Sequence, residues 1–136
     1  MEALYNAQYY RRFNDNSIVG THIIPRLKFE YQLSRPIFIR LVGQYDAQHQ
    51  DSLRDNSRTN LPIFIYDPTT NSYSRAAAYT TNSFRLDWLF SYQPTPGTVF
   101  FFGYGNTSTE PMSLRFQALR RTTDDFFVKF SYLWRM

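Results

Sequence analysis

Metal binding and acid–base catalysis both need histidine or carboxylate side chains placed near one another. His49 lies between Asp46 and Asp51 in the sequence, and imidazole with carboxylate is a common metal ligand set. The whole chain has only two histidines and no cysteine, however, so the other ligands of a metal site are missing. A polar residue at the end of a strand is the simpler interpretation of His49, and we expect no metal.

A second acidic group lies close to the carboxyl terminus. Asp124 and Asp125 are adjacent, and Glu110 lies on the same polar connection. Two carboxylates can act as general acid and base, but no nucleophile or base accompanies these three. The chain also lacks a Ser/His/Asp order, a glycine-rich phosphate loop and a nucleophile elbow. Solvated loop charges are therefore expected, and the sequence predicts neither an enzyme nor a bound cofactor.

Regularly spaced charges are the larger chemical feature of the chain. In several segments they occupy alternate positions, which lie on one face of a β-strand. Inside a small soluble barrel such charges would need partners at a large desolvation cost, whereas a water-filled lumen keeps them hydrated. There they would set selectivity, contact a plug, or pair across strands to fix the register. The expected lumen-facing residues are Arg26, Lys28, Glu30, Arg40, Asp46, Arg85, Asp87 and Lys129.

Large apolar residues alternate with these charges. A helix, with its period of about 3.6 residues, would mix the two sets within two turns, so the alternation favours β-strands. An apolar row opposite a polar row is typical of a strand with lipid on one side and water on the other. The expected lipid-facing residues are Leu27, Phe29, Tyr31, Ile39, Leu41, Leu86, Trp88, Phe90, Phe130, Tyr132 and Trp134.

These patterns predict an all-β chain: an antiparallel up-and-down meander of about six long strands, forming part of a transmembrane β-barrel and occupying all of 1–136. The expected strands are 3–13, 22–34, 36–49, 82–93, 98–107 and 125–136. Segment 98–107 is apolar at both parities. We expect Phe100, Phe102 and Tyr104 to face outward, which leaves Gly103 and Gly105 inward, where a backbone can approach closely or a sheet can bend.

The expected connections alternate between short and long. The short ones are 34–36 and 94–97, and the long ones are 14–21, 51–82 and 107–124. Outer-membrane barrels have tight periplasmic turns and longer extracellular loops, so this alternation fits a periplasmic carboxyl terminus. In the longest connection, LPIFIYD and NSYSRAAAY flank DPTTN, which predicts a hairpin. We expect the third and fourth strands to continue through it as a protruding ribbon, and 113–119 to extend the region beside the last strand.

Arginines are frequent on the long connections. On the outer side of a membrane they could bind lipopolysaccharide phosphates, because a guanidinium pairs with phosphate through two hydrogen bonds. Solvated loop charge is the alternative. The arginines concerned are Arg54, Arg58, Arg75, Arg120 and Arg121.

Composition narrows the remaining classes. Aromatic residues make up 19% of the chain, which favours strands over helices. The net charge of +4 is scattered and forms no basic arm, so nucleic acid is not expected as a partner. No apolar run approaches the roughly 18 residues of a membrane helix. The start MEALYNAQYYRRF has no basic region followed by an apolar stretch, so we expect no secretory signal within it.

Three stretches carry a resemblance to a known family: IPRLKFEYQLSRPIFIRLVGQYDAQ, FRLDWLFSYQPTPGTVFFFGYGNT and DDFFVKFSYLWRM. They resemble the carboxyl-terminal barrel portion of a largely uncharacterised family of bacterial outer-membrane proteins. Members of that family carry an amino-terminal carbohydrate-binding module of the family-nine type ahead of a many-stranded barrel. The similarity covers the chain from about Thr21 onward, and the turns SRP and QPTPGT and the ending VKFSYLWRM are its most specific parts. It implies a membrane-embedded barrel and assigns no functional residue.

The smallest ordinary single-chain barrels have about eight strands, more than the six expected here. The expectation is therefore a carboxyl-terminal fragment or a truncated reading frame, located in the bacterial outer membrane, with a structural or pore role and no chemistry of its own. The expected partners are outer-membrane lipid including lipopolysaccharide, the barrel-assembly machinery that would read the last strand, and the remaining strands of a larger barrel. Residues expected in the aromatic girdles are Tyr45, Trp88, Tyr92, Tyr132 and Trp134.

The alternative is a soluble β-barrel that binds a small apolar ligand. In such a carrier the apolar rows point inward to the ligand, and a chain of this length usually forms more and shorter strands joined by uniformly short turns. The direction of the apolar rows and the strand length therefore separate the two interpretations.

Overall fold

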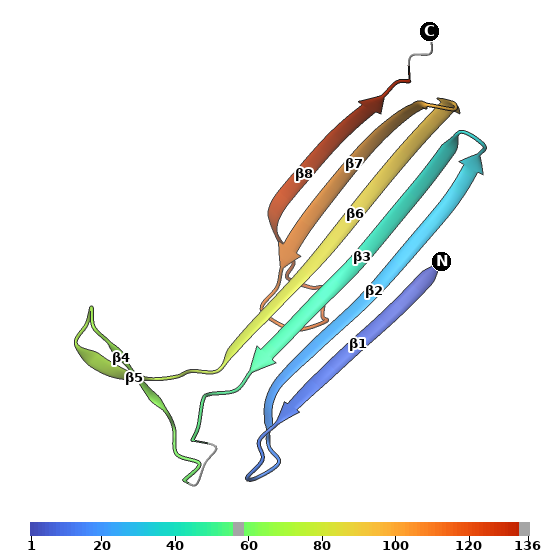
Figure 1. Ribbon diagram of the computed structural model, residues 1–136. Coiled ribbons are helices and arrows are strands. Elements are labelled where there is room, and N and C mark those ends of the chain that lie inside the picture. Colours follow the sequence, from blue (N-terminus) through green and yellow to red (C-terminus); the bar gives the residue numbers. More distant parts are fainter. Residues whose placement is uncertain (56–58, 134–136) are drawn as a thin grey trace.

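The computed structural model describes residues 1–55 and 59–133, and these residues contain strands and no helix. Six strands form one antiparallel sheet in which the spatial order follows the chain, β1-β2-β3-β6-β7-β8 (Figure 1). The strands are β1 (Glu2–Arg11), β2 (Ile18–Ser34), β3 (Ile37–Gln50), β6 (Tyr79–Thr95), β7 (Thr98–Thr109) and β8 (Arg120–Ser131). The expected all-β antiparallel meander of six long strands is confirmed.

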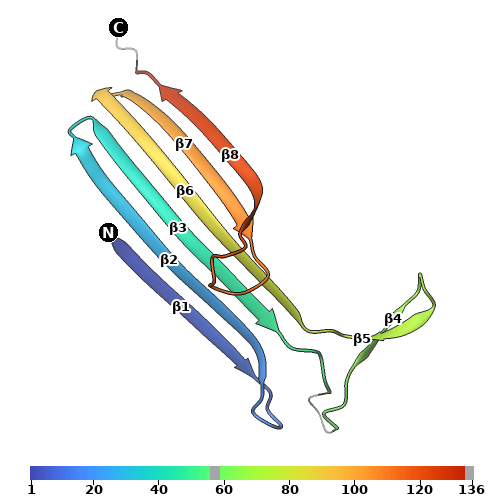
Figure 2. The same cartoon turned by 180° about the vertical axis from the view of Figure 1, so that it is seen from behind.

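The strands are long because the alternating pattern is long. Both β2 and β6 have 17 residues, whereas about 9–11 are enough to cross a bilayer at a tilt. The sheet is a single layer whose first and last strands, β1 and β8, are not paired with each other, so it is open rather than closed into a barrel (Figures 1 and 2).

The last strand differs most from its expected range. It begins at Arg120 and ends at Ser131, because its pairing with β7 continues past Thr107 through a register shift to Thr109. Beyond the strand, the amide of Leu133 donates a hydrogen bond of 2.9 Å to the carbonyl oxygen of Gly97. The expected strand residues 134–136, including Trp134, lie outside the described part of the chain.

Short and long connections lie at opposite ends of the sheet (Figure 1). Only Arg35 and Pro36 join β2 to β3, and only Pro96 and Gly97 join β6 to β7. Gly97 adopts a φ of 95°, a conformation that glycine accepts without steric cost. The three long connections lie at the other end.

A separate hairpin projects from the longest connection (Figure 1). It consists of β4 (Phe64–Asp67) and β5 (Ser72–Arg75), which pair only with each other. The Asp67 carboxylate closes the turn by accepting hydrogen bonds from the Thr69 amide at 2.8 Å and the Thr70 hydroxyl at 3.0 Å. The expected hairpin is therefore present. It is not a continuation of β3 and β6, whose pairing ends at Gln50 and Tyr79.

The course of segment 110–119 differs from the predicted one. It does not extend the region beside the last strand but folds back across the sheet, where Figure 2 shows it in front of β3 and β6. Under this segment lies the small buried core of the described residues, in which Tyr45 is 2% and Ala47 5% exposed.

Candidate functional site

The register of the sheet places most of the large apolar residues on one face, although Phe38, Leu89, Phe101 and Phe127 lie on the other. Directly paired residues of antiparallel strands point to the same side, so each row across the sheet can be followed from strand to strand. One row is Phe29, Leu41, Trp88, Tyr104 and Phe126, and the next is Tyr31, Ile39, Phe90, Phe102 and Val128. We call this side the apolar face. The rows also place Phe100, Phe102 and Tyr104 on it, which removes the ambiguity of β7.

Most of the apolar face is uncovered. Phe29 is 45% exposed, Leu27 is 48% exposed and Phe130 is 66% exposed. These side chains do not converge on a dry interior. Soluble monomers rarely expose contiguous apolar patches larger than a few hundred Å², so the apolar face is the main candidate for a contact surface in this chain.

Segment 110–119 covers the apolar face at the end of the sheet that carries the long connections. The ring of Phe116 lies 5.2 Å from the ring of Tyr45 and 5.7 Å from that of Phe84, measured between centroids. The Tyr45 hydroxyl donates to the Glu110 carboxylate and accepts a hydrogen bond of 2.9 Å from the Leu114 amide. The segment is thus held by one aromatic contact and one buried polar contact.

Asn82 completes this polar contact. Its side-chain amide donates to the carbonyl oxygen of Glu110 at 3.2 Å, and its side-chain oxygen accepts from the Ser113 hydroxyl at 2.7 Å. Asn82 is 2% and Glu110 7% exposed. These buried polar groups therefore have partners inside the protein, as buried polar groups usually do, and this end of the sheet is not part of the exposed apolar surface.

An apolar groove separates Phe116 from strands β1 to β3. Its volume is about 480 Å³, and its wall is almost entirely carbon. Gly43 forms part of the floor, where the nearest atoms to a Cβ would be those of Phe84 at 3.7 Å. The groove is continuous with the exposed apolar face.

The opposite side, which we call the charged face, carries the charges of the expected ladder. Lys28, Asp87 and Asp125 share one row with Val42 and Gly105, and Arg26 and Arg85 share the next row with Gln44. Glu30 and Arg40 are paired directly.

Two members of the expected ladder lie away from its centre. Asp46 contacts His22 at 3.0 Å near the end with the long connections. Lys129 pairs with Phe101, toward the end with the tight turns.

Ion pairs on the charged face are formed mainly within strands. The Lys28 ammonium lies 3.0 Å from Glu30 of the same strand, and Arg85 Nε lies 3.0 Å from both carboxylate oxygens of Asp87. Across strands, Lys28 lies 3.8 Å from Glu2. Two of the three contacts at 3.0 Å therefore join neighbours two positions apart on one strand, whereas the contact of Asp46 with His22, also at 3.0 Å, joins β3 to β2.

Two glycines of β7 make room for side chains on the charged face. The ring of Phe127 lies directly over Gly103, where any Cβ would overlap it. A Cβ at Gly105 would lie 2.9 Å from a carboxylate oxygen of Asp87. The expected close approach at these glycines therefore comes from side chains of β8 and β6.

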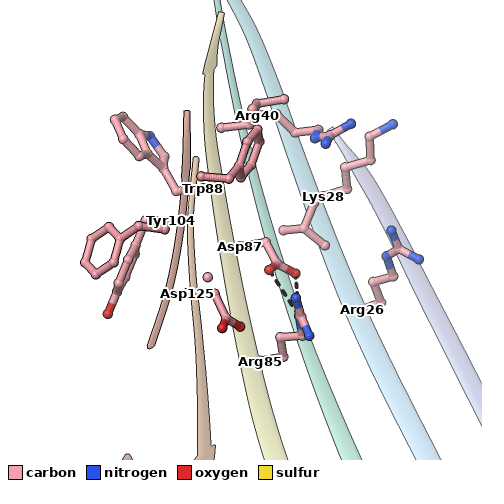
Figure 3. A pocket seen from close by; sticks show the side chains of 13 residues that line it. Arg26, Lys28, Arg40, Arg85, Asp87, Trp88, Tyr104 and Asp125 are labelled. Carbon is pink, nitrogen blue, oxygen red and sulfur yellow. Dashed lines mark hydrogen bonds and ion pairs between the residues drawn. The ribbon is translucent and has the colours of Figure 1, made fainter. Parts of the chain in front are cut away.

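The charged face contains a hollow of about 460 Å³ (Figure 3). Arg26, Lys28 and Arg40 extend to the same side of the sheet in Figure 3, whereas Trp88 and Tyr104 extend to the other side. The guanidiniums of Arg26 and Arg40 have no hydrogen bond or ion pair with any described residue. The hollow therefore contains free donors for an anion.

The long connections are joined by a buried arginine that sequence reasoning missed. The Arg12 side chain is 2% exposed and contacts the Asp51 carboxylate at 2.9 Å, the Ser52 carbonyl at 2.8 Å and the Ser17 hydroxyl at 2.9 Å. Hydrogen bonds from the Ser52 amide and from Arg12 lower the pKa of Asp51 below its usual value. No local pattern reveals the contact with Asp51 and Ser52, because Ser52 lies 40 residues from Arg12 in the sequence.

The candidate metal residues are not brought together. His49 lies on the face opposite to Asp46, because the two have different parity, and its ring nitrogen Nδ1 lies 2.9 Å from the Thr80 hydroxyl. Among residues 1–55 and 59–133 no group of three or more His, Cys, Asp or Glu side chains could hold a metal ion.

The carboxylate pair is likewise divided between the two faces. Asp124 accepts a hydrogen bond of 2.6 Å from the Tyr104 hydroxyl, on the side of the apolar face, and Arg121 lies 3.6 Å from it. Asp125 is paired with Gly105 on the charged face. The two carboxylates therefore cannot act on one substrate.

The arginines expected on the long connections do not form one cluster. Arg75 donates weakly to the Ser52 hydroxyl at 3.4 Å, and Arg120 is exposed at the start of β8. Arg54 forms an isolated bridge with Pro62, and Arg58 lies outside the described residues. Tyr92, an expected girdle residue, is 40% exposed at the end with the tight turns.

Comparisons of the chain with models of protein families, with curated proteins and with solved structures found no match in any of the three. The described residues include no helix of the length and apolarity that crossing a membrane requires.

Proposed function

We propose that this chain is a segment of an outer-membrane β-barrel with a structural or pore role and without chemistry of its own. The observation that carries the proposal is the apolar face: six strands in register present most of their large apolar side chains to one side and most of their charges to the other. Fully burying each such side chain is worth roughly 1.5–3 kcal/mol, so an uncovered face of this size represents a large unfavourable free energy in water. Hydrocarbon removes that cost.

The length of the apolar rows supports the proposal. Along β3 the apolar side chains run from Ile37 to Ala47, and along β6 from Phe84 to Tyr92, a length comparable to the about 9–11 residues of a tilted transmembrane strand. Tyr45, Ala47 and Phe84, at one end of these rows, are covered by segment 110–119. Segment 110–119, with its buried polar contacts, then lies at the outer limit of the hydrocarbon. The tight turns at the other end suit a periplasmic side.

The open edges define the partners in this proposal. The unpaired edges of β1 and β8 would be satisfied by further strands of the same barrel, because a sheet in lipid must close to satisfy its backbone groups. Lipid including lipopolysaccharide would contact the apolar face and the outer arginines, and the barrel-assembly machinery would read the alternating last strand.

The test places a single tryptophan at one of two neighbouring positions of β6, 88 or 89, and compares its quenching by lipid. In a Trp134→Phe background, Trp88 reports on the apolar face, and a matched variant that also carries Trp88→Phe and Leu89→Trp reports on the charged face. Both proteins are folded into vesicles whose acyl chains carry bromine, which quenches tryptophan on contact. We expect strong quenching at position 88 and little at position 89. Equal quenching at both positions, or none at position 88, would refute the proposal.

The same proteins test the alternative, a soluble barrel that binds an apolar ligand. The apolar groove of about 480 Å³ is the observation that favours this alternative. A carrier would remain monodisperse without detergent, and its Trp88 would be protected from lipid bromine and from aqueous acrylamide alike. A membrane segment would require detergent or lipid to remain dispersed.

A further inference from the structure

We propose that Arg26 and Arg40, with the ion-paired Lys28 between them, form a binding site for a small anion that carries phosphate or paired carboxylate groups. The inference rests on the proposed function in one respect, because a charged face that lines a lumen is where solutes would meet this site. The three cations come from two neighbouring strands. Lys28 is paired with Val42, and Arg26 and Arg40 lie on either side of this pair, opposite Gln44 and Glu30 respectively.

The acidic groups around the site are already engaged. Asp87 accepts both hydrogen bonds of Arg85, at 3.0 Å each, and Glu30 lies 3.0 Å from the Lys28 ammonium. Glu2 lies farther from Lys28, at 3.8 Å. This leaves the two guanidiniums of Arg26 and Arg40 unpaired among the described residues, with Asp125 of β8 as the remaining carboxylate at the hollow.

Two free guanidiniums favour a particular ligand chemistry. Each presents a planar pair of N–H donors that matches two oxygens of a phosphate or a carboxylate, and such charge-assisted hydrogen bonds are the stronger ones in proteins. The two arginines lie four positions apart along neighbouring strands, so a ligand with acidic groups at two ends engages both only if it spans the distance between the two guanidiniums. A ligand with one acidic group would engage only one.

The hollow has room for such a ligand. Its volume of about 460 Å³ lies within the usual range of small-molecule sites, about 300–1,000 Å³. Val42 and Leu89 add apolar surface to its lining. Arg26 and Arg40 are exposed, so solvent and salt screen their charge. We therefore expect reversible binding of modest affinity.

Titration calorimetry with inorganic pyrophosphate, on the full chain folded in detergent micelles at low salt, tests the site. We expect the parent to bind and the double variant Arg26→Gln/Arg40→Gln to bind at least about tenfold more weakly, the scale of one lost charge-assisted pair. The matched control is Arg35→Gln/Arg115→Gln, which removes the same charge from the tight turn and from segment 110–119. It should bind as the parent does.

Further variants separate geometry from charge. Arg26→Lys/Arg40→Lys keeps the charge but loses the planar fork, so intermediate binding is expected. No binding by the parent, or an equal loss in the control pair, would overturn the inference. The calorimetry does not depend on the quenching experiment with Trp88. If no anion binds, the quenching result still tests the membrane location. If Trp88 is not quenched, the calorimetry still tests the anion site.

Discussion

At the level of single residues, β7 shows how glycine and a neighbouring ring can form one unit. Gly103 exposes backbone on the charged face, and the ring of Phe127 from β8 covers it. An aromatic ring over a strand glycine restores the contacts that the missing side chain would have made. The sequence shows two glycines in an apolar run and so indicates a close approach, but it does not indicate which residue approaches.

We predict that Gly103→Ala destabilises the sheet by about 1–3 kcal/mol, the usual cost of overpacking, because the new methyl group displaces the Phe127 ring. The urea midpoint of the chain in micelles measures the change. Gly43→Ala is the matched control: its Cβ would meet its nearest atoms at 3.7 Å, an ordinary contact, so stability should be unchanged or slightly higher. Equal effects at the two glycines would contradict the contact.

At the level of elements, segment 110–119 is the part that departs most from a plain meander. It leaves β7 at Thr109, crosses the apolar face to Tyr45 and Phe84, and returns to begin β8 at Arg120. Its attachment combines the Phe116 ring with the hydroxyl of Tyr45. In the proposed membrane location, a segment attached in this way would limit how far lipid reaches along β3 and β6.

Tyr45→Phe should release this segment. The substitution keeps the ring against Phe116 but removes the hydroxyl, which leaves Glu110 and the Leu114 amide without their partner at a cost of about 1–3 kcal/mol. Tryptic cleavage after Arg115 reports the release, and we expect it to become several-fold faster. Tyr31→Phe on the same face, where Tyr31 is 52% exposed, serves as the control. An unchanged cleavage rate would show that the hydroxyl does not hold the segment.

At the level of the whole molecule, one layer of sheet with two unlike faces is the central feature. A single sheet buries little of its own apolar surface, and the described residues have only Tyr45 and Ala47 as buried hydrophobic residues. Such a sheet depends on its surroundings and on its edge partners for stability. The proposed membrane location supplies both.

A charge placed on the apolar face should therefore have a much larger effect than the same charge on the charged face. We expect Leu41→Arg to reduce the stability of the folded chain in vesicles by about 2–4 kcal/mol, the cost of arginine near the bilayer midplane. The control is Val42→Arg, one residue along the same strand and between Lys28 and Asp87, which should cost much less. Urea titration of the vesicle-bound protein measures both. Similar losses would exclude lipid as the environment of the apolar face.

Much of this architecture follows from local pattern. The alternation of side chains in a strand is a property of the backbone, so the sequence alone separates Leu27 and Phe29 from Arg26 and Lys28. The turn residues Arg35-Pro36 and Pro96-Gly97 likewise mark both tight connections. The expected six-stranded antiparallel meander needed no more than these two signals.

The remaining features depend on contacts between residues far apart in the chain. Arg12 reaches a carbonyl 40 residues away and Tyr45 a carboxylate 65 residues away, and no local propensity encodes such pairs. The register likewise decided which face Phe102 shares with Phe90 and Val128, because β7 is apolar at both parities. The sequence by itself determined that two unlike faces exist. Tertiary structure decided what lies over each of them, because packing is settled only when strands and connections meet in space.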